Sequence, residues 1–282
     1  MTVPVSGTSP TALPTFTEPC TDPSAPPRRA WVAQIMGLPV SVHVRGPRAR
    51  GPEVAGVIAD LFAALRADDA EFSTWQPDSP VSRIRRGQLA LADAGPRVRA
   101  VAALCEEAAE RTGGAFSGWL PGPGGRSVFD PTGLVKGWAV QEAFSAALAA
   151  LGPLGRHDAL ISAGGDVAVA CSRTDTPDWL IAVEDPRDRS RTLLSIPLRS
   201  GAVATSGTAA RGQHIVDPVT GAAASGLLSA TVVGPSLLWA DVYATAAFVR
   251  GPEAASWLAT LDSHAAVLVG ADATVQNVTP TP

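Results

Sequence analysis

The segment SLLWADVYATAAFVRG, residues 236–251, constrains the fold of this chain more than any other stretch. Its pattern predicts a helix, and apolar side chains occupy almost every position around the helix axis. A helix without a polar face is buried when the chain folds, so other elements have to cover it. Yet the same helix carries Asp241 and Thr245, which lie one turn apart and therefore on one side of it.

A buried Asp241 needs a cation or several hydrogen-bond donors, because its charge loses the surrounding water. Carboxylate and hydroxyl oxygens one turn apart suit a hard cation such as Mg²⁺. The alternative is that Asp241 caps a neighbouring element or pairs with an arginine from it.

Lys136 is the only lysine in the chain, since the other 21 of the 22 basic residues are arginines. It lies in FDPTGLVKGWAV, residues 129–140, six residues after Asp130 and behind a Pro-Thr-Gly turn. Lysine offers a compact point charge, whereas arginine offers a planar fork. Lys136 therefore marks either a site that the fork does not fit or one surviving surface lysine.

The segment HIVDPVTG places His214 and Asp217 at the end of an expected strand, just before a turn. A histidine among turn residues can serve as a general base or contact a phosphate. The alternative is an ordinary hydrogen-bonded histidine at a strand end.

Two turns rich in small residues, AGGDV (163–167) and TSGTAARG (205–212), would let a ligand approach backbone N–H groups. Glycine pairs also occur at many ordinary turns, and neither a P-loop nor a GxGxxG fingerprint is present. Trp75, in the polar segment EFSTWQPDS, is either a stacking platform for a planar ligand or a packing residue.

The composition allows one large domain or two intimate ones, with 282 residues and 46% hydrophobic residues. The net charge of −4 argues against a broad basic surface for nucleic acid or anionic membranes. Three widely spaced cysteines without a CxxC pair fit a reducing compartment, so we expect a cytoplasmic protein. No apolar run reaches the length of about 18 residues that a membrane span needs.

The chain is expected to divide into a tail, one domain and a short end. Residues 1–28 are rich in proline and lack the basic start and apolar run of a signal peptide, so they are expected to be a disordered tail. Residues 29–275 should form the domain, and residues 276–282 a frayed C-terminus.

Periodicity predicts helices and strands that do not alternate regularly along the domain. Helices are expected over residues 52–73, 98–114, 137–152 and 236–251. Two strands are expected over 31–46 around Met36-Gly37, another at 127–130, and several after residue 155. This order favours the α+β class, with mixed β-sheets flanked by helices.

Taken in order and spacing, the motifs of this chain resemble the ApbE family of FAD:protein FMN transferases. The similarity runs over about residues 35–251. It passes through FSTWQPDSPVSRI, TGGAFS, FDPTGLVKGWAV, ISAGGDVAV, VEDP, ATSGTAARGQHIVDPVTG and ADVYATAAFVRG. The resemblance implies a single large α+β domain of the ApbE type, related to the T-fold.

The resemblance also implies FAD contacts from residues spread over these motifs. They are Met36, Trp75, Ala115, Phe116, Ser117, Asp130, Lys136, Gly164, Gly165, Asp166, Ser206, Gly207, His214 and Val216. It implies Mg²⁺ ligands from the side chains of Asp241 and Thr245 and from the carbonyl of Gly133. His214 or Asp217 would take the proton of the attacking hydroxyl.

The implied reaction moves FMN from FAD onto a threonine or serine hydroxyl of a partner protein with an FMN-binding domain, and releases AMP. Two alternatives are an FAD pyrophosphatase, which uses water, and a flavin-binding protein without turnover. Four residues depart from the usual pattern and keep these alternatives open: Leu38, Trp75, Arg85 and Ala244. The family's frequent lipoprotein or secretion signal is not expected here.

Overall fold

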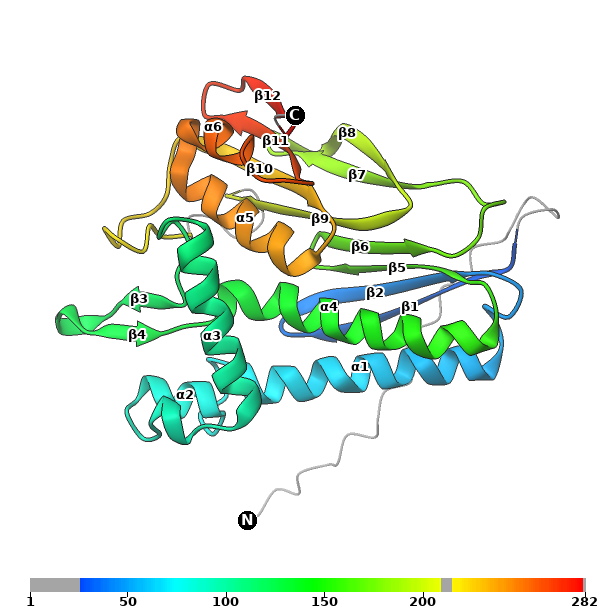
Figure 1. Cartoon of the computed structure of the whole chain (residues 1–282), viewed down its shortest axis with the longest axis horizontal. Helices are drawn as coiled ribbons and strands as arrows, with labels where there is room; N and C mark the ends of the chain where they lie inside the picture. Colours follow the sequence, from blue (N-terminus) through cyan, green and yellow to red (C-terminus); the bar gives the residue numbers. More distant parts are fainter. Residues whose placement is uncertain (1–25, 209–214, 281–282) are drawn as a thin grey trace, which may run out of the picture.

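An antiparallel sheet of eight strands forms the centre of the structure, a computed structural model that describes residues 26–208 and 215–280 (Figure 1). The strand order is β1-β2-β5-β6-β9-β10-β11-β12. The bounds are β1 Arg28–Ile35, β2 Leu38–Arg45, β5 Asp158–Ala163, β6 Asp166–Cys171, β9 Ser200–Gly207, β10 Leu227–Gly234, β11 Ala265–Gly270 and β12 Val275–Val278. This sheet with its helices confirms the predicted α+β class, but the strand pairs that the structure describes are all antiparallel and not mixed as expected.

Three long helices cover one face of the sheet: α1 Pro52–Phe72, α4 Thr132–Leu151 and α5 Leu237–Arg250. The helix α4 lies between α1 and α5 (Figure 1). The main hydrophobic core fills the space between this helical layer and the sheet.

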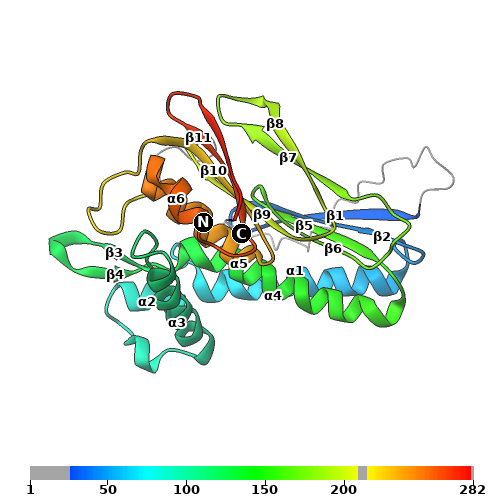
Figure 2. The same ribbon diagram turned by 45° about the horizontal axis from the view of Figure 1, so that its top comes forward.

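The opposite face of the sheet is partly covered by a β-hairpin of β7 Trp179–Asp185 and β8 Asp188–Leu198 (Figure 2). Ile181 of this hairpin belongs to a small second core with Val167 and Val203 of the sheet. The centre of the sheet is therefore covered on both faces.

Shorter elements complete the domain. They are the helices α2 Pro80–Arg85, α3 Pro96–Arg111 and α6 Ala254–Leu258, the strands β3 Trp119–Pro121 and β4 Ser127–Phe129, and the single turns η1 Leu91–Asp93, η2 Pro123–Gly125, η3 Gly152–Leu154 and η4 Gly251–Glu253. The β3–β4 hairpin, α2 and α3 gather at one end of the molecule (Figure 1).

The helix α5 is buried, as its sequence predicted. It packs against β9 and β10 on one side and against α4 on another. Asp241 and Phe248 are both almost inaccessible to solvent. Truncating a buried phenylalanine such as Phe248 to alanine is expected to cost about 3–5 kcal/mol.

The predicted strand pair around Met36-Gly37 is confirmed, since β1 and β2 pair in register from Ile35–Leu38 outwards. Met36 and Gly37 both adopt positive φ angles, 55° and 69°. Such a left-handed pair closes a tight two-residue hairpin turn.

The start of α4 differs from the prediction, because the helix begins at Thr132 and not at residue 137. The Asp130 carboxylate accepts hydrogen bonds from the backbone N–H and the hydroxyl of Thr132, at 3.2 and 2.6 Å. These bonds stabilise the first turn, as a capping side chain does. Lys136 therefore lies within a helix and not in a turn.

Two further segments also differ from the prediction. Residues 80–85 form α2, because Ser79 caps the backbone N–H of Ser82 and Pro80 begins the helix. The segment HIVDPVTG does not continue as a strand within its described residues 215–221. Val216 instead makes an isolated bridge to Ala223.

The expected boundaries of the domain also shift. The expected fraying from residue 276 is wrong up to Val278, which is buried and pairs with β11. The domain begins at Arg28, where β1 starts. Within the described ranges, no helix combines the length and apolar character needed to cross a bilayer.

Candidate functional site

Three charged side chains from three different elements meet where α4, α5 and the β5–β6 turn converge. The Lys136 ammonium bonds to Oδ2 of Asp166 and lies 3.2 Å from Oδ1 of Asp241. The Asp166 and Asp241 side chains are 3% and 5% exposed, whereas that of Lys136 is 23% exposed. We call these three residues the acid–lysine cluster, and it is open to solvent on the lysine side.

Gly137 allows α4 and α5 to approach each other at the cluster. A Cβ atom at this position would lie 3.0 Å from Oδ2 of Asp241 and 3.2 Å from the carbonyl oxygen of Leu237. Any larger residue would therefore separate the two helices and pull Lys136 away from Asp241.

The turn of Gly164 and Gly165 delivers Asp166 to the cluster. Both glycines have positive φ angles, 61° and 101°, which lets β5 and β6 connect through two residues. Asp166 then accepts a hydrogen bond from the backbone N–H of Thr205 on β9, at 3.0 Å. The expected ligand-binding turn thus also anchors a carboxylate.

Asp241 keeps one carboxylate oxygen available. Its Oδ2 atom is buried and makes no hydrogen bond of normal geometry among the residues that the structure describes, although the backbone of Gly137 lies close to Asp241 and acts to lower its pKa. Burial raises the pKa of Asp241 to about 7, against the opposing charge of Lys136. A buried carboxylate oxygen without a donor is costly, so a bound cation would stabilise this position.

Lys136 stays protonated in this setting. Burial alone disfavours its charge, but Asp166 and then Asp241 outweigh that effect and raise the pKa of the ammonium. The cluster therefore combines a fixed positive charge with two carboxylates.

Thr245 lies one turn beyond Asp241 on α5, as predicted. Its hydroxyl is 3.0 Å from the hydroxyl of Ser206 on β9. The oxygens of Asp241 and Thr245 are of the type that Mg²⁺ prefers, so these residues fit the expected cation. Within residues 26–208 and 215–280, no group of three or more His, Cys, Asp or Glu forms a ready-made metal cage.

Gly133 occupies the first turn of α4 and is packed by an aromatic ring. A Cβ atom there would lie 3.2 Å from Cε2 of Phe116. Phe116 is itself buried. Its role in the structure is to pack against the start of α4, and a bound molecule would meet the backbone of the segment more readily than this ring.

Ala115 and Ser117 flank Phe116 in the same loop. The Ser117 hydroxyl bonds to the backbone of Trp119, with both the N–H and the carbonyl at 2.9 Å. The backbone N–H of Phe116 donates to the Thr112 hydroxyl at 3.0 Å. Side-chain bonds therefore fix the conformation of the loop on both sides of Phe116.

Asp130 has both carboxylate oxygens in use. Besides the bonds to Thr132, its Oδ2 atom accepts a hydrogen bond from Arg85 at 2.7 Å. Arg85, one of the residues that depart from the usual pattern, thereby links the end of α2 to the start of α4. A direct contact of Asp130 with a ligand stays a prediction.

Trp75 is 93% exposed. The Ser73 hydroxyl accepts hydrogen bonds from the backbone N–H groups of Trp75 and Gln76, at 3.2 and 3.1 Å, and so shapes the loop. An exposed indole on a shaped loop is available to stack on a planar ligand. Met36, whose N–H donates to Asp69 at 3.2 Å, lies at the tip of the β1–β2 hairpin.

The Asp217 carboxylate holds the turn that follows it. It accepts bonds from the backbone N–H of Val219 at 2.8 Å and from the Thr220 hydroxyl at 3.0 Å. These donors lower the pKa of Asp217 and make it a weaker base, and the N–H of Val219 has the larger effect. His214, the other predicted base, lies outside the described residues.

Gly207 at the end of β9 is required by packing, because a Cβ atom there would lie 2.7 Å from the carbonyl oxygen of Leu228. Of the predicted residues, the structure brings together Lys136, Asp166 and Asp241, with Ser206 and Thr245 bonded to each other one turn along α5. Sequence reasoning missed Gly137, since a glycine inside a helix carries no signal of what packs against it.

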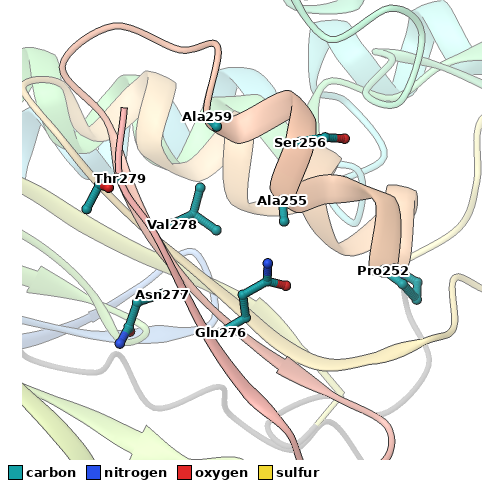
Figure 3. Close-up of a pocket in the computed structure, with 8 residues that line it drawn as sticks. All are labelled: Pro252, Ala255, Ser256, Ala259, Gln276, Asn277, Val278 and Thr279. Atoms are coloured by element: carbon teal, nitrogen blue, oxygen red, sulfur yellow. The ribbon is translucent and has the colours of Figure 1, made fainter. Parts of the chain in front are cut away.

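An open groove of about 540 Å³ lies elsewhere, between α6 and β12 (Figure 3). Its lining residues are Pro252, Ala255, Ser256, Ala259, Gln276, Asn277, Val278 and Thr279. These side chains are small or uncharged, so the groove lacks the acids, bases and cations that a group-transfer site needs. The acid–lysine cluster is the better candidate.

Comparison with known proteins gives matches to one family. The model of the ApbE family matches residues 36–120 and 118–269. The FAD:protein FMN transferases of Klebsiella pneumoniae (strain 342) and Escherichia coli (strain K12) are 31% and 29% identical to the chain over 106 residues. Each match covers 34% of this chain and 30% of the relative, so it spans less than a third of the relative's length.

Solved structures show the same fold. The ApbE protein of Thermotoga maritima superposes with a TM-score of 0.76 at 21% identity, covering 89% of this chain and 97% of that one. The apo flavinyl transferase ApbE of Pseudomonas stutzeri gives 0.74 at 22% identity, with 92% and 97% covered. The flavin transferase ApbE of Vibrio cholerae gives 0.69 at 18% identity, with 91% and 98% covered.

Proposed function

The chain belongs to the ApbE family, and from this premise we propose that it transfers FMN from FAD to a threonine or serine hydroxyl of a partner protein, with Mg²⁺ as cofactor. The names of the curated relatives support the reaction, since both are FAD:protein FMN transferases. The partner would be an acceptor protein with an FMN-binding domain.

One observation carries the proposal: a carboxylate oxygen of Asp241 that the described residues leave unbonded, beside a protonated Lys136. Transfer from a diphosphate requires its negative charge to be offset. A cation held by Asp241 and Thr245, together with Lys136, would place positive charge on two sides of such a group. When bound, Mg²⁺ would supply Lewis-acid stabilisation of the phosphate oxygens.

In the proposed step, the acceptor hydroxyl oxygen attacks the phosphorus of the FMN half of FAD. A new P–O bond forms, and the bond from this phosphorus to the bridging oxygen breaks. AMP leaves with the bridging oxygen, and the hydroxyl proton passes to a general base. Lys136 would keep its proton throughout and act as a fixed positive charge.

We assign the base to His214, by its sequence position three residues before Asp217. The hydrogen bonds to Val219 and Thr220 give Asp217 a role in holding the turn and lower its basicity. An unperturbed histidine, with a pKa of about 6.5, is suited to take a proton near neutral pH. Trp75 would stack on the flavin ring.

The test is to incubate the purified chain with FAD and Mg²⁺, with and without an acceptor protein that carries an FMN-binding domain. The proposal predicts AMP together with a flavin-labelled acceptor. AMP and free FMN without an acceptor would identify a pyrophosphatase instead. Bound FAD without AMP under either condition would identify a flavin-binding protein.

A further inference from the structure

Arg250, the last residue of α5, is bonded to the loop that follows α3. Its Nη2 atom donates to the backbone carbonyl of Thr112 at 2.5 Å. Gly113 has a φ angle of 58°, and a Cβ atom on it would lie 3.1 Å from the same Nη2. The guanidinium therefore fills the bend of this loop.

Thr112 connects the Arg250 contact to Phe116. Its side chain is completely buried, and its hydroxyl accepts the N–H of Phe116 at 3.0 Å while donating to Ala108 at 2.7 Å. The Phe116 ring in turn packs beside Gly133 at the start of α4. A continuous series of contacts thus leads from Arg250 to the first turn of α4.

We propose that Arg250 is a positioning residue for FAD, which acts by holding residues 115–117 against the start of α4. The inference rests on the proposed function and on the FAD contacts that the family resemblance implies for residues 115–117. Arg250 acts through Thr112 and not by touching the reacting atoms. Loss of its bond should loosen the loop and weaken FAD binding, with little effect on turnover once FAD is bound.

Arg111, the last residue of α3, provides a matched control. The guanidinium of Arg250 lies over the ring of Trp257 at 4.7 Å, and that of Arg111 over the ring of Trp239 at 4.1 Å. Arg111 bonds to Glu107 and to the Tyr243 hydroxyl, at 2.8 and 3.4 Å. Both arginines therefore stack on an indole, but of the two only Arg250 donates a hydrogen bond to the backbone carbonyl of Thr112.

The experiment compares Arg250→Met with Arg111→Met in FAD affinity, in kcat at saturating FAD and in hydrogen exchange of the Phe116 amide. Arg250→Met should weaken FAD binding about tenfold, the effect of one lost charged hydrogen bond, and accelerate Phe116 exchange, with kcat within about twofold. Arg111→Met should leave FAD affinity and Phe116 exchange within about twofold of the wild type. Arg250→Lys should restore part of the affinity, because an ammonium offers one donor to the carbonyl.

Thr112→Val serves as a second route if Arg250→Met does not fold. It keeps the backbone carbonyl that Arg250 bonds, but it removes the hydroxyl that accepts the Phe116 N–H and donates to Ala108, so it should weaken FAD binding in the same way. Normal FAD affinity in these variants, or an equal loss in Arg111→Met, would overturn the inference. A wild-type chain that binds no FAD would instead overturn the proposed function itself.

Discussion

The two ends of the β5–β6 hairpin each carry a buried aspartate, and the two ends differ in how these acids are bonded. At one end, Asp158 accepts the N–H of Arg173 at 3.0 Å, the Nε of Arg45 at 2.9 Å and the hydroxyl of Thr176. At the other end, Asp166 shares Lys136 with Asp241, whose Oδ2 no described residue bonds. Burial alone therefore does not show whether a carboxylate is fully bonded within the chain; the donors around it do.

The pKa values follow the same division. Burial acts to raise the pKa of Asp158, but the bonds from Thr176, Arg173 and Arg45 outweigh it and lower the value. Burial raises the pKa of Asp241 to about 7 because Lys136 offsets only part of it. At one end of the hairpin the carboxylate of Asp158 is therefore fully bonded, whereas Asp241, beside the other end, keeps one buried oxygen that a proposed cation would stabilise.

The largest difference between the two ends is expected when Asp241, beside one end, and Asp158, at the other end, are each replaced by asparagine. Asp241→Asn is expected to lower Mg²⁺-dependent AMP release about 100-fold or more, because metal-ion catalysis supplies several kcal/mol. Its free energy of unfolding should fall less than that of Asp158→Asn, because Lys136 keeps its bond to Asp166 when the Asp241 charge is removed.

The control is Asp158→Asn, which breaks a buried ion pair and should lower the free energy of unfolding by about 3 kcal/mol. Its AMP release per folded molecule should equal that of the wild type. Denaturant melts and AMP assays check both variants, and the contrast fails if Asp241→Asn turns over normally at limiting Mg²⁺.

The next largest difference is expected between substitutions of the two basic residues, Lys136 and Arg45. Lys136→Met should lower AMP release about 10- to 100-fold, because a fixed charge beside the diphosphate is lost. Lys136→Arg should recover only part, since the guanidinium is larger and spreads its charge. Arg45→Met at the Asp158 end should lower the melting temperature and spare turnover. Full activity in both Lys136 variants would leave Lys136 with a structural role only.

Adding a single methyl group should sharpen the contrast further. Gly137→Ala would place Cβ 3.0 Å from Oδ2 of Asp241 and should cost about 1–3 kcal/mol. Gly56→Ala on the exposed side of α1, where no atom lies within 4 Å of the added Cβ, should stabilise by about 0.5–1 kcal/mol. Thermal melts check both, and Gly137→Ala should also raise the Mg²⁺ concentration needed for half-maximal AMP release.

The smallest expected effect is on acid stability. Because the pKa of Asp158 is lower in the folded protein, its contribution is complete above the unfolded value of about 3.9 and is lost as the pH falls below it. Asp158→Asn should therefore flatten the loss of stability below about pH 4. If the free energy of unfolding falls equally steeply with pH in the variant and the wild type, Asp158 does not dominate the loss of stability in acid.

In the sequence, the two ends of the hairpin look alike. Asp158 and Asp166 each begin a short run of small apolar residues, so the local pattern predicts the strands but not which donors bond each acid. The donor Arg45 lies 113 residues from Asp158, and Lys136 lies 30 residues from Asp166. Such pairings depend on the sheet order, which periodicity does not specify.

The burial of helix α5 was predictable because it follows from a local pattern: apolar residues all around the helix, with one acid and one hydroxyl a turn apart. The start of α4 was missed because the decisive bonds, from Asp130 to Thr132, belong to capping and not to periodicity. The strand β12 was missed for a similar reason, since its four residues gain their order from pairing with β11.

The helix α5 carries Asp241 in its first turns and Arg250 at its end, about 14 Å apart along the axis at 1.5 Å per residue. A buried, continuous helix moves as one rigid rod, so a ligand that steadies either end also limits motion at the other. Cation binding and dinucleotide binding should then be thermodynamically linked, each increasing the affinity for the other by the same factor. The chain would thus bind the proposed cation best when FAD is already bound, and FAD best when the cation is already bound.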